Sequence, residues 1–357
     1  MSRCQTYANA CRNTNLTSMS EPKPNTVNMA DVARQAGVSV STVSRVLAGA
    51  SGVSEATRQR ISAIARDLSY VVSPNASRLA SGSTKQVVVV VPETETWFYY
   101  AILGSMEPVL RAAGLDLLLY RLTGTADRTT FFAQLPARRK VDAVVLVGLP
   151  LSLAHLERLD TMGLPIIMVG SLIDGYPCVR VDELTVARQA VQHLLRMDHS
   201  RIGMICIVDK EGESWQPGVG RESGYRETLA NAGVEFDPDL EVQVNFSVDG
   251  GARAMDQLLS LERPPTAVFA FSDEIAIGAM RSLKRAGISI PAKISIVGVD
   301  DHPMAELSDL TTVRQPVHEM GAMAAKLVVD ILDGKPVAPV ITLPTHLVVR
   351  GSTAPPP

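Results

Sequence analysis

The chain has 357 residues, enough for two or three domains, and its 46% hydrophobic and 20% charged residues predict a sizeable core and exclude global disorder. The net charge of −3 is divided unevenly, since residues 1–85 carry ten Lys and Arg against four Asp and Glu (+6) and residues 86–357 carry 24 against 33 (−9). A basic start on an acidic body predicts a polyanionic partner for the start alone.

Four segments follow one another along the chain. Residues 1–26 are polar, lack the apolar run of a signal peptide and are expected to form a disordered tail. Residues 27–71 predict a small helical domain. Residues 72–84 are rich in Ser, Gly and Pro and predict a connector or hinge. Residues 85–357 have the composition of a large folded body.

The small domain is predicted to hold three short helices. Asn28 is placed to cap the first, Gly37 to end it in the left-handed conformation, and Ser39 and Ser54 to cap the second and third. Helices this short need one another for stability. The apolar positions expected to form their shared core are Val32, Ala33, Ala36, Val43, Val46, Leu47, Ile61, Ile64, Ala65 and Leu68.

The second of these helices has a face without large apolar side chains. Val40, Ser41, Ser44 and Arg45 lie opposite the apolar stripe. Two helices joined by a tight glycine turn, with a small and basic outer face, are typical of a helix-turn-helix whose second helix enters the DNA major groove. Arg45 is suited to guanine O6 and N7, and the hydroxyls to base edges or phosphates. The alternative is an ordinary solvated face; the positive charge of residues 1–85 favours DNA.

The body alternates apolar runs with amphipathic helices. Runs without polar alternation indicate strands covered on both faces, and hence a doubly wound α/β body. The number of runs predicts two parallel sheets. The stretch 340–353 predicts a final strand pair. The predicted strands are 87–91, 115–120, 142–148, 165–170, 201–208, 267–271 and 294–300.

Two helices of the body are predicted from the regular spacing of their apolar residues. Residues 183–197 are expected to bury Val186, Ala190, Leu194 and Met197, and residues 273–286 to bury Ile277, Met280 and Leu283. Between the first helix and the next strand, His199 is expected to be a turn residue, and Asp198 to adopt the left-handed conformation.

Polar and aromatic residues follow the ends of several predicted strands. Asp300 ends one run, Ser272 ends another, and Trp97 and Phe98 lie in the loop after a third, while Arg221 starts a helix. Ligands of doubly wound sheets bind beyond the carboxyl ends of the strands, so these residues predict a pocket for a sugar or polyol. Competing roles remain: Trp97 as core, Asp273 as a helix cap, and Asp182 as either a cap or a ligand contact.

The headpiece sequence "MADVARQAGVSVSTVSRVLAG" followed by "VSEATRQRISAIARDLSY" resembles the LacI/GalR family of bacterial transcription regulators. The body resembles the same family through "RESGY", "FSDEIAIGAM", "VGVDD" and "TTVRQP". The resemblance implies a homodimer on a palindromic double-stranded operator, and a body like periplasmic sugar-binding proteins with an effector between two subdomains. The DNA-binding residues expected from the helix face and the resemblance are Asn28, Ser39, Val40, Ser41, Thr42, Ser44, Arg45 and Leu79.

In that family the connector folds as a hinge helix on DNA, and the resemblance places Leu79 of "ASRL" as the minor-groove wedge. A plain flexible linker is the alternative. Pro74 departs from the pattern, because it stands two places later after Tyr70 than the family's Tyr-x-Pro-Asn requires. For the pocket, the resemblance adds Phe246 and Gln315. The expected effector-binding residues are Trp97, Phe98, Asp182, Arg221, Phe246, Ser272, Asp300 and Gln315.

These patterns predict a sequence-specific transcription regulator, a repressor that a sugar-like effector releases from its operator. A co-repressor role for the effector, and activation, remain alternatives; a solute-binding protein or a sugar-active enzyme is more remote. No P-loop lysine or nucleophile–His–acid pattern is present, so no enzyme is expected. The scattered cysteines lack metal spacing, so neither metal nor cofactor is expected, and without an apolar run of ~18 residues a cytoplasmic protein is expected. The end lacks a leucine heptad, which favours a dimer over a heptad-driven tetramer.

Overall fold

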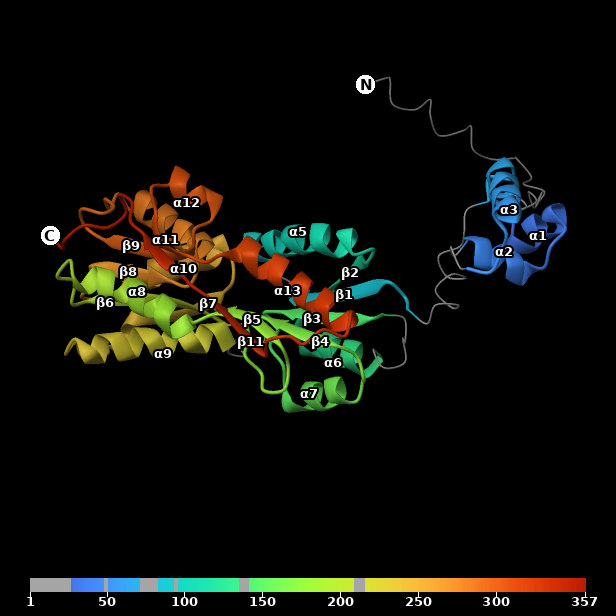
Figure 1. Cartoon of the computed structure of the whole chain (residues 1–357). Coiled ribbons are helices and arrows are strands. Elements are labelled where there is room, and N and C mark those ends of the chain that lie inside the picture. The colour runs from blue at the N-terminus through green and yellow to red at the C-terminus, as the bar shows by residue number, and fades with distance from the viewer. Residues whose placement is uncertain (1–26, 48–50, 71–82, 93–95, 135–140, 209–215) are drawn as a thin grey trace, which may run out of the picture. The chain divides into compact units, whose positions relative to one another are not determined.

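The computed structural model describes residues 27–47, 51–70, 83–92, 96–134, 141–208 and 216–357 (Figure 1). The chain forms two compact units whose boundary lies between residues 82 and 83. We call them the headpiece and the body. The expected tail 1–26 and the part of the hinge that carries Pro74 and Leu79 lie outside the described residues.

The headpiece consists of the three predicted helices, α1 (Met29–Ala36), α2 (Val40–Leu47) and α3 (Glu55–Asp67). Asn28 caps α1, because its Oδ1 accepts hydrogen bonds from the N–H groups of Ala30 (2.9 Å) and Asp31 (3.2 Å). Gly37 ends that helix at φ +65°, and Ser54 caps α3. The predicted stripes meet in one small core, in which the most buried side chains are Val32, Val43 and Ile61.

The first sheet of the body is entirely parallel, with strand order β11-β5-β4-β3-β1-β2. One of its faces packs on α5 (Trp97–Ala112) and α13 (Val317–Leu332), and α6 (Gly124–Gln134) and α7 (Leu153–Asp160) cover the other (Figure 1). The strands are β1 (Gln86–Pro92), β2 (Asp116–Leu122), β3 (Ala143–Val147), β4 (Ile166–Val169), β5 (Cys178–Val181) and β11 (Val340–Leu343).

The second sheet has the order β12-β10-β9-β8-β6-β7 and is parallel except for β12, which runs antiparallel to β10. Its strands are β6 (Ile202–Val208), β7 (Glu241–Asn245), β8 (Ala267–Ala270), β9 (Ser295–Asp300), β10 (Thr311–Arg314) and β12 (His346–Val348). Its helices are α8 (Glu183–Leu195), α9 (Gln216–Asn231), α10 (Val248–Leu259), α11 (Asp273–Arg285) and α12 (Pro303–Leu307), and a 3-10 turn covers Pro238–Leu240.

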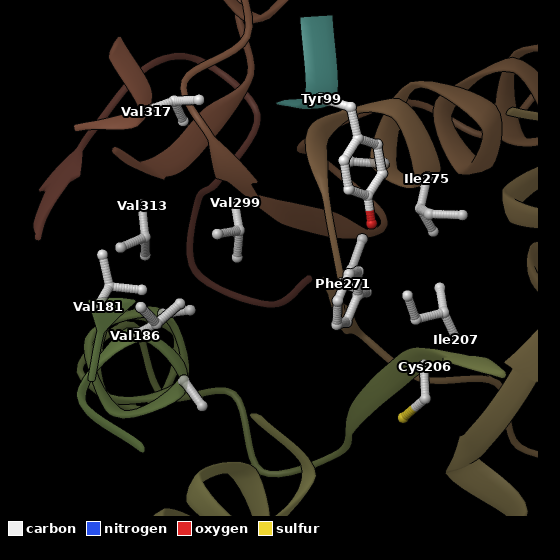
Figure 2. Packing of buried hydrophobic residues seen from close by; sticks show 14 of the residues in the cluster. Tyr99, Val181, Val186, Cys206, Ile207, Phe271, Ile275, Val299, Val313 and Val317 are labelled. Carbon is white, nitrogen blue, oxygen red and sulfur yellow. The ribbon is translucent and has the colours of Figure 1, made fainter. Parts of the chain in front are cut away.

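One hydrophobic core joins the two sheets of the body. The same cluster holds Val89 of β1 and Val299 of β9. Alternate residues of β1 point the other way, and Val88 and Val90 pack in a second cluster under α6 and α7. Coverage of both faces explains the unbroken valine run, as the sequence predicted. Figure 2 shows part of the joint core, with Tyr99 near Phe271.

Three strands of the body escaped prediction, namely β5, β7 and β10. The expected final strand pair is wrong as a pair, because β11 joins the first sheet and β12 the second. Two residues, Pro344 and Thr345, carry the chain from one sheet to the other. This crossing links the two sheets directly.

The predicted helix faces are partly right. In α8, Val186, Ala190 and Leu194 are fully buried as predicted, whereas Met197 lies beyond the end of the helix. In α11, the residues expected to be buried at 277 and 280 are only half-buried, and Leu283 alone was assigned correctly. The buried stripe of α11 consists of Ile275, Ala276, Ala279 and Leu283.

Two pairs of helices pack closely through glycines. A Cβ on Gly251 of α10 would lie 2.1 Å from the carbonyl oxygen of Ile275 in α11. Similarly, a Cβ on Gly220 of α9 would lie 2.7 Å from the Cβ of Glu183 at the start of α8. The backbones therefore approach more closely than any side chain would allow, and Glu183 is held against α9.

His199 is not the turn residue that the sequence predicted, because it is 2% exposed. Its Nδ1 lies 2.9 Å from Thr266 Oγ1, and its Nε2 lies 2.8 Å from the carbonyl oxygen of Ala354. Burial lowers its pKa. The adjacent Asp198 adopts φ +66°, as predicted. His199 thus fastens the C-terminal segment to the second sheet.

Candidate functional site

The outer face of α2 presents the side chains that the sequence assigned to DNA. Ser41 and Arg45 are exposed, and Val40 exposes 47% of its surface although it is apolar. Arg45 forms no ion pair with another described residue. Val43 and Val46 hold this face outward by packing into the headpiece core.

The first turn of α2 is ordered by its own hydroxyls. Ser39 Oγ accepts a hydrogen bond from the Thr42 N–H (3.2 Å) and lies 2.8 Å from the hydroxyls of Ser41 and Thr42. Ser39 therefore caps the helix, as expected from the sequence. Asn28 similarly uses its Oδ1 for the cap of α1. Both positions combine a structural role with an exposed location.

A small cavity lies between the two sheets of the body, beyond the carboxyl ends of their strands. Its volume is about 40 Å³, which holds a few water molecules at ~10–15 Å³ each. Four aromatic rings and a few polar groups line it. The lining residues are Phe98, Tyr99, Gly148, Gly170, Glu183, Arg221, Phe246, Phe271, Asp300, Gln315 and Met320.

A buried ion pair forms one wall of the cavity. Arg221 Nε–H donates to Glu183 Oε2 (2.6 Å), and Nη1–H donates to the carbonyl oxygen of Phe271 (2.5 Å). The guanidinium carbon also lies 4.2 Å from the centroid of the Phe271 ring. Burial raises the pKa of Glu183, and the charge of Arg221 opposes this shift. The arginine fork is thus held in one orientation, with the aromatic ring beneath it.

Asp300 contributes a second buried carboxylate to the lining of the cavity. Gln315 Nε2–H donates to its Oδ1 at 2.6 Å. Burial raises the pKa of Asp300, and the nearby carboxylate of Asp273 raises it further. The residue adopts φ +120°, a strained conformation for a side chain other than glycine. A carboxylate buried at the edge of a cavity accepts hydrogen bonds from ligand hydroxyls or amines.

Ion pairs on the neighbouring residue hold this strained backbone in place. Asp301 also has a positive φ of +57°. Its carboxylate accepts hydrogen bonds from Arg350 (2.6 Å) and Arg314 (2.5 Å). Although burial acts to raise the pKa of Asp301, these two arginines lower it below its usual value. The pair of arginines therefore fixes the turn that aims Asp300 at the cavity.

The structure brings five of the eight sequence-predicted effector residues together around this cavity. They are Phe98, Arg221, Phe246, Asp300 and Gln315. Phe98 does so from the first turn of α5, not from a loop as the sequence suggested.

The other three predicted residues do not line the cavity. Ser272 is the N-cap of α11, and its Oγ accepts from the Ile275 N–H. Asp182 lines a neighbouring pocket and accepts a hydrogen bond from the Thr185 hydroxyl (2.5 Å). Trp97 starts α5, where its N–H donates to Glu274 Oε1 (3.0 Å) and its ring meets His302 edge-on.

Asp273 is not the cap of α11 that the sequence favoured, since Ser272 holds that position. Its buried carboxylate instead accepts from the Thr312 hydroxyl (2.6 Å) and the His302 N–H (2.8 Å). Asp273 therefore ties α11 to the loop after β9 and to β10.

Several lining residues were missed by the sequence analysis, and most are neighbours of residues that it selected. Tyr99 follows Phe98, Glu183 follows Asp182, and Phe271 precedes Ser272. The ends of strands were thus a correct signal, but the sequence did not show which of two adjacent side chains faces inward. Met320, far along the chain on α13, had no such signal.

Two further properties bear on the kind of site. Among the described residues, no group of three or more His, Cys, Asp or Glu side chains is arranged to hold a metal ion. In the same part of the chain, no helix combines the length and the apolar character needed to cross a bilayer.

Two family models match parts of the chain, one in each unit. Residues 28–75 match the model of bacterial regulatory proteins of the lacI family, and residues 191–353 match a periplasmic binding protein-like domain. The chain is 33% identical over 333 residues to the HTH-type transcriptional repressor CytR of Escherichia coli K12, covering 91% of this chain and 96% of CytR.

Solved structures agree over the same length. A Lac repressor dimer bound to operator and the anti-inducer ONPF superposes with a TM-score of 0.81 at 25% identity, covering 92% of this chain and 99% of that one. A complex of the regulator CelR with cellobiose gives a TM-score of 0.68 at 32% identity, covering 91% and 99%. With a helix-turn-helix headpiece, a body of two parallel-sheet subdomains and relatives matched over nearly their whole length, the chain belongs to the lacI family of bacterial DNA-binding transcription regulators.

Proposed function

We propose that the cavity of the body binds a sugar or similar polyol, and that this ligand releases the protein from its operator. The observation that carries the proposal is a cavity lined by a buried carboxylate, Asp300, and a buried guanidinium, Arg221, together with aromatic rings. Hydroxyl groups are both donors and acceptors, and aromatic rings pack on the apolar face of a sugar ring. Phe98, Phe246 and Gln315 complete the proposed site.

The size of the cavity supports a change of shape on binding. A volume of about 40 Å³ is too small for a sugar ring, so a ligand must move the two sheets apart or displace side chains. In a homodimer, such a movement of one subdomain alters the spacing of two headpieces on a palindromic operator. The relatives bound to operator or to a sugar support both halves of this scheme.

For DNA recognition, we propose that α2 enters the major groove. Arg45 pairs with guanine, and Ser39, Ser41, Thr42 and Ser44 contact base edges or phosphates. Val40 supplies an apolar contact from the same face. Leu79 remains a predicted minor-groove wedge, and its test is the loss of operator affinity in Leu79→Ala, of about 1–3 kcal/mol.

The experiment begins with gel shifts of genomic fragments at several salt concentrations, followed by a sugar panel added to the complex. We expect one fragment to be bound in preference to random DNA, and one sugar to release it. Asp300→Asn should retain operator affinity while losing the response to the sugar. Binding without sequence preference would refute the DNA assignment, and a sugar that tightens the complex would make it a co-repressor.

The proposed role involves no turnover. The bound sugar should be recovered chemically unchanged after prolonged incubation with the protein, as judged by mass spectrometry. Conversion of the sugar would favour the enzymatic alternative.

A further inference from the structure

A single carboxylate holds the segment through which the connector enters the body. Ser83 and Thr84 are the last two residues of the predicted connector, 72–84, and the described part of the body begins with them. Asp142 stands directly before β3, and its N–H donates to the carbonyl oxygen of Gln86, the first residue of β1 (2.8 Å). The end of the connector and Asp142 therefore meet at the amino ends of two neighbouring strands.

Four hydrogen bonds converge on the Asp142 carboxylate. Its Oδ1 accepts from the Thr84 N–H (2.8 Å) and the Thr84 hydroxyl (2.9 Å). Its Oδ2 accepts from the Ser83 hydroxyl (2.5 Å) and the Lys85 N–H (2.8 Å). Lys85 adopts φ +55°, which is uncommon for a residue other than glycine, and in this turn the N–H groups of Thr84 and Lys85 reach the same carboxylate. Both oxygens thus bind a run of three consecutive residues, which we call the anchor.

The charge of Asp142 suits this role. Burial acts to raise its pKa, but the hydrogen bonds from Ser83, Thr84 and Lys85 outweigh burial and lower the pKa below its usual value. The group is therefore a carboxylate at neutral pH and an acceptor at both oxygens. Hydrogen bonds to a charged acceptor are roughly twice as strong as those between neutral groups.

The residues of the anchor belong to no helix or strand. Lys85 is also held through its carbonyl oxygen, which accepts from the Asp116 N–H (2.7 Å). Loss of the Asp142 carboxylate would therefore release Ser83 and Thr84 from the sheet while Lys85 stays in place. Two extended residues span up to about 7 Å, which is roughly twice the ~3.4 Å rise of one base pair.

We infer that Asp142 is a positioning residue for operator binding, which fixes where the connector leaves the body and so sets the separation of the two headpieces in a dimer. This inference rests on the proposed binding of a homodimer to a palindromic operator. A dimer selects one spacing of two half-sites only if both connectors start from fixed points. A longer tether reaches sites over a wider range of distances, so connectors without the anchor tolerate other spacings.

The test compares three synthetic duplexes by gel shift, with the full-length protein at fixed salt. The first is the operator recovered from the genomic fragments, and the other two carry one base pair more or one fewer at its centre. For the wild-type protein we expect the altered spacings to lower affinity about tenfold or more, because each change shifts one half-site by ~3.4 Å and rotates it by about a tenth of a turn. Asp142→Ala should bind all three duplexes within about threefold of one another, with unchanged affinity for random DNA.

Two further variants separate the anchor from effects of charge and folding. Glu157→Ala removes the same charge from an exposed position on α7 and should keep the wild-type discrimination between spacings. Ser83→Ala combined with Thr84→Val removes the two hydroxyl donors but leaves the carboxylate and both N–H groups, and should give intermediate discrimination. If Asp142→Ala fails to fold by circular dichroism, this double variant decides, and full wild-type discrimination in it would count against the anchor.

The outcomes separate this inference from the proposed function. If Asp142→Ala discriminates between spacings as the wild type does, or if Glu157→Ala loses that discrimination too, the anchor does not set the spacing and the inference is overturned. A wild-type protein that prefers its operator to random DNA but binds all three spacings alike also overturns the inference and leaves operator recognition intact. If the wild type shows no preference for any fragment over random DNA, the operator proposal fails and the inference fails with it.

Discussion

At the scale of single residues, Arg45 is the charged side chain of the α2 face that we propose to discriminate between bases. Arg45→Ala removes an exposed guanidinium group that forms no ion pair with another described residue, so folding should be unaffected. We expect a loss of about 1–3 kcal/mol in specific operator binding, measured by gel shift at fixed salt.

The control for this prediction is Arg60→Ala, which removes the same charge from an exposed position on α3. It should leave the ratio of operator affinity to random-DNA affinity unchanged, because the attraction between a positive charge and the phosphates carries no sequence information. Equal ratios of specific to non-specific affinity in the two variants would contradict the assignment of Arg45.

A second residue-scale prediction concerns His199 and pH. Because burial lowers its pKa in the folded state, the folded protein favours the neutral ring. Its contribution to stability is therefore complete above the unfolded-state pKa of about 6.5 and is lost as pH falls toward the folded-state value, at ~1.4 kcal/mol per unit of difference. His199→Gln should flatten the dependence of the unfolding free energy on pH between about 7 and 5.

The measurement is urea unfolding at several pH values. His193 stays in both proteins, and its pKa is lowered chiefly by burial, so only the smaller part that the charge of His199 causes differs in the comparison. Parallel pH curves for wild type and variant would show that His199 does not titrate in this range.

At the scale of elements, the close packing of α8 on α9 predicts that replacing glycine by alanine changes the stability of the body in opposite directions at two helix positions. A Cβ on Gly224 would lie 2.8 Å from the Cβ of Ala187 and 2.8 Å from the carbonyl oxygen of Leu184. Gly224→Ala should therefore destabilise the body by about 1–3 kcal/mol. Gly104→Ala, in α5 with no atom within 4 Å of the new Cβ, should stabilise it by roughly 0.5–1 kcal/mol.

Tryptophan fluorescence in urea isolates the body, because both tryptophans of the chain lie beyond residue 85. The urea midpoints of the two variants should shift in opposite directions from that of the wild type. The dependence of the unfolding free energy on urea concentration should stay unchanged. A loss in Gly104→Ala as large as that in Gly224→Ala would mean that contact between α8 and α9 is not the cause of the destabilisation.

The helices and strands also show how much of the fold could be predicted from the sequence. Long apolar runs such as residues 87–91 identified buried strands, because coverage on both faces leaves no room for polar residues. Strand β10 (Thr311–Arg314) was missed because two of its four residues are threonines, which are buried through hydrogen bonds that a hydropathy pattern cannot show. The α11 face was misread for a related reason: small buried residues, Ala276 and Ala279, carry little hydrophobic signal.

At the scale of the whole molecule, the site could be predicted as a location but not as a set of contacts. The rule that ligands bind beyond the carboxyl ends of strands placed Asp300 and Arg221 in one region. The pairing of Arg221 with Glu183 joins residues that are 38 positions apart in the chain. The neighbouring pocket that Asp182 lines likewise combines residues from distant parts of the chain. Both are products of tertiary packing.

The whole-molecule prediction concerns the coupling between the headpiece and the body. If a sugar in the cavity weakens operator binding by some factor, linkage requires that operator DNA weaken sugar binding by the same factor. We expect factors of about 5–150, which is the usual range of allosteric coupling. The first factor is the ratio of operator affinities with and without saturating sugar, measured by gel shift. The second is the ratio of sugar affinities with and without operator duplex, measured by calorimetry. Both are measured at one salt concentration, because phosphate contacts make operator affinity depend on salt.

Asp300→Asn distinguishes coupling through the cavity from an effect elsewhere. Its carboxylate faces the cavity and lies in the body, so the variant should bind operator as tightly as wild type while the sugar changes that affinity by less than about twofold. A sugar response that survives in this variant would place the effector outside the cavity. Unequal factors in the wild-type protein would mean that the sugar also changes the assembly state, because reciprocity holds only between the same pair of equilibria.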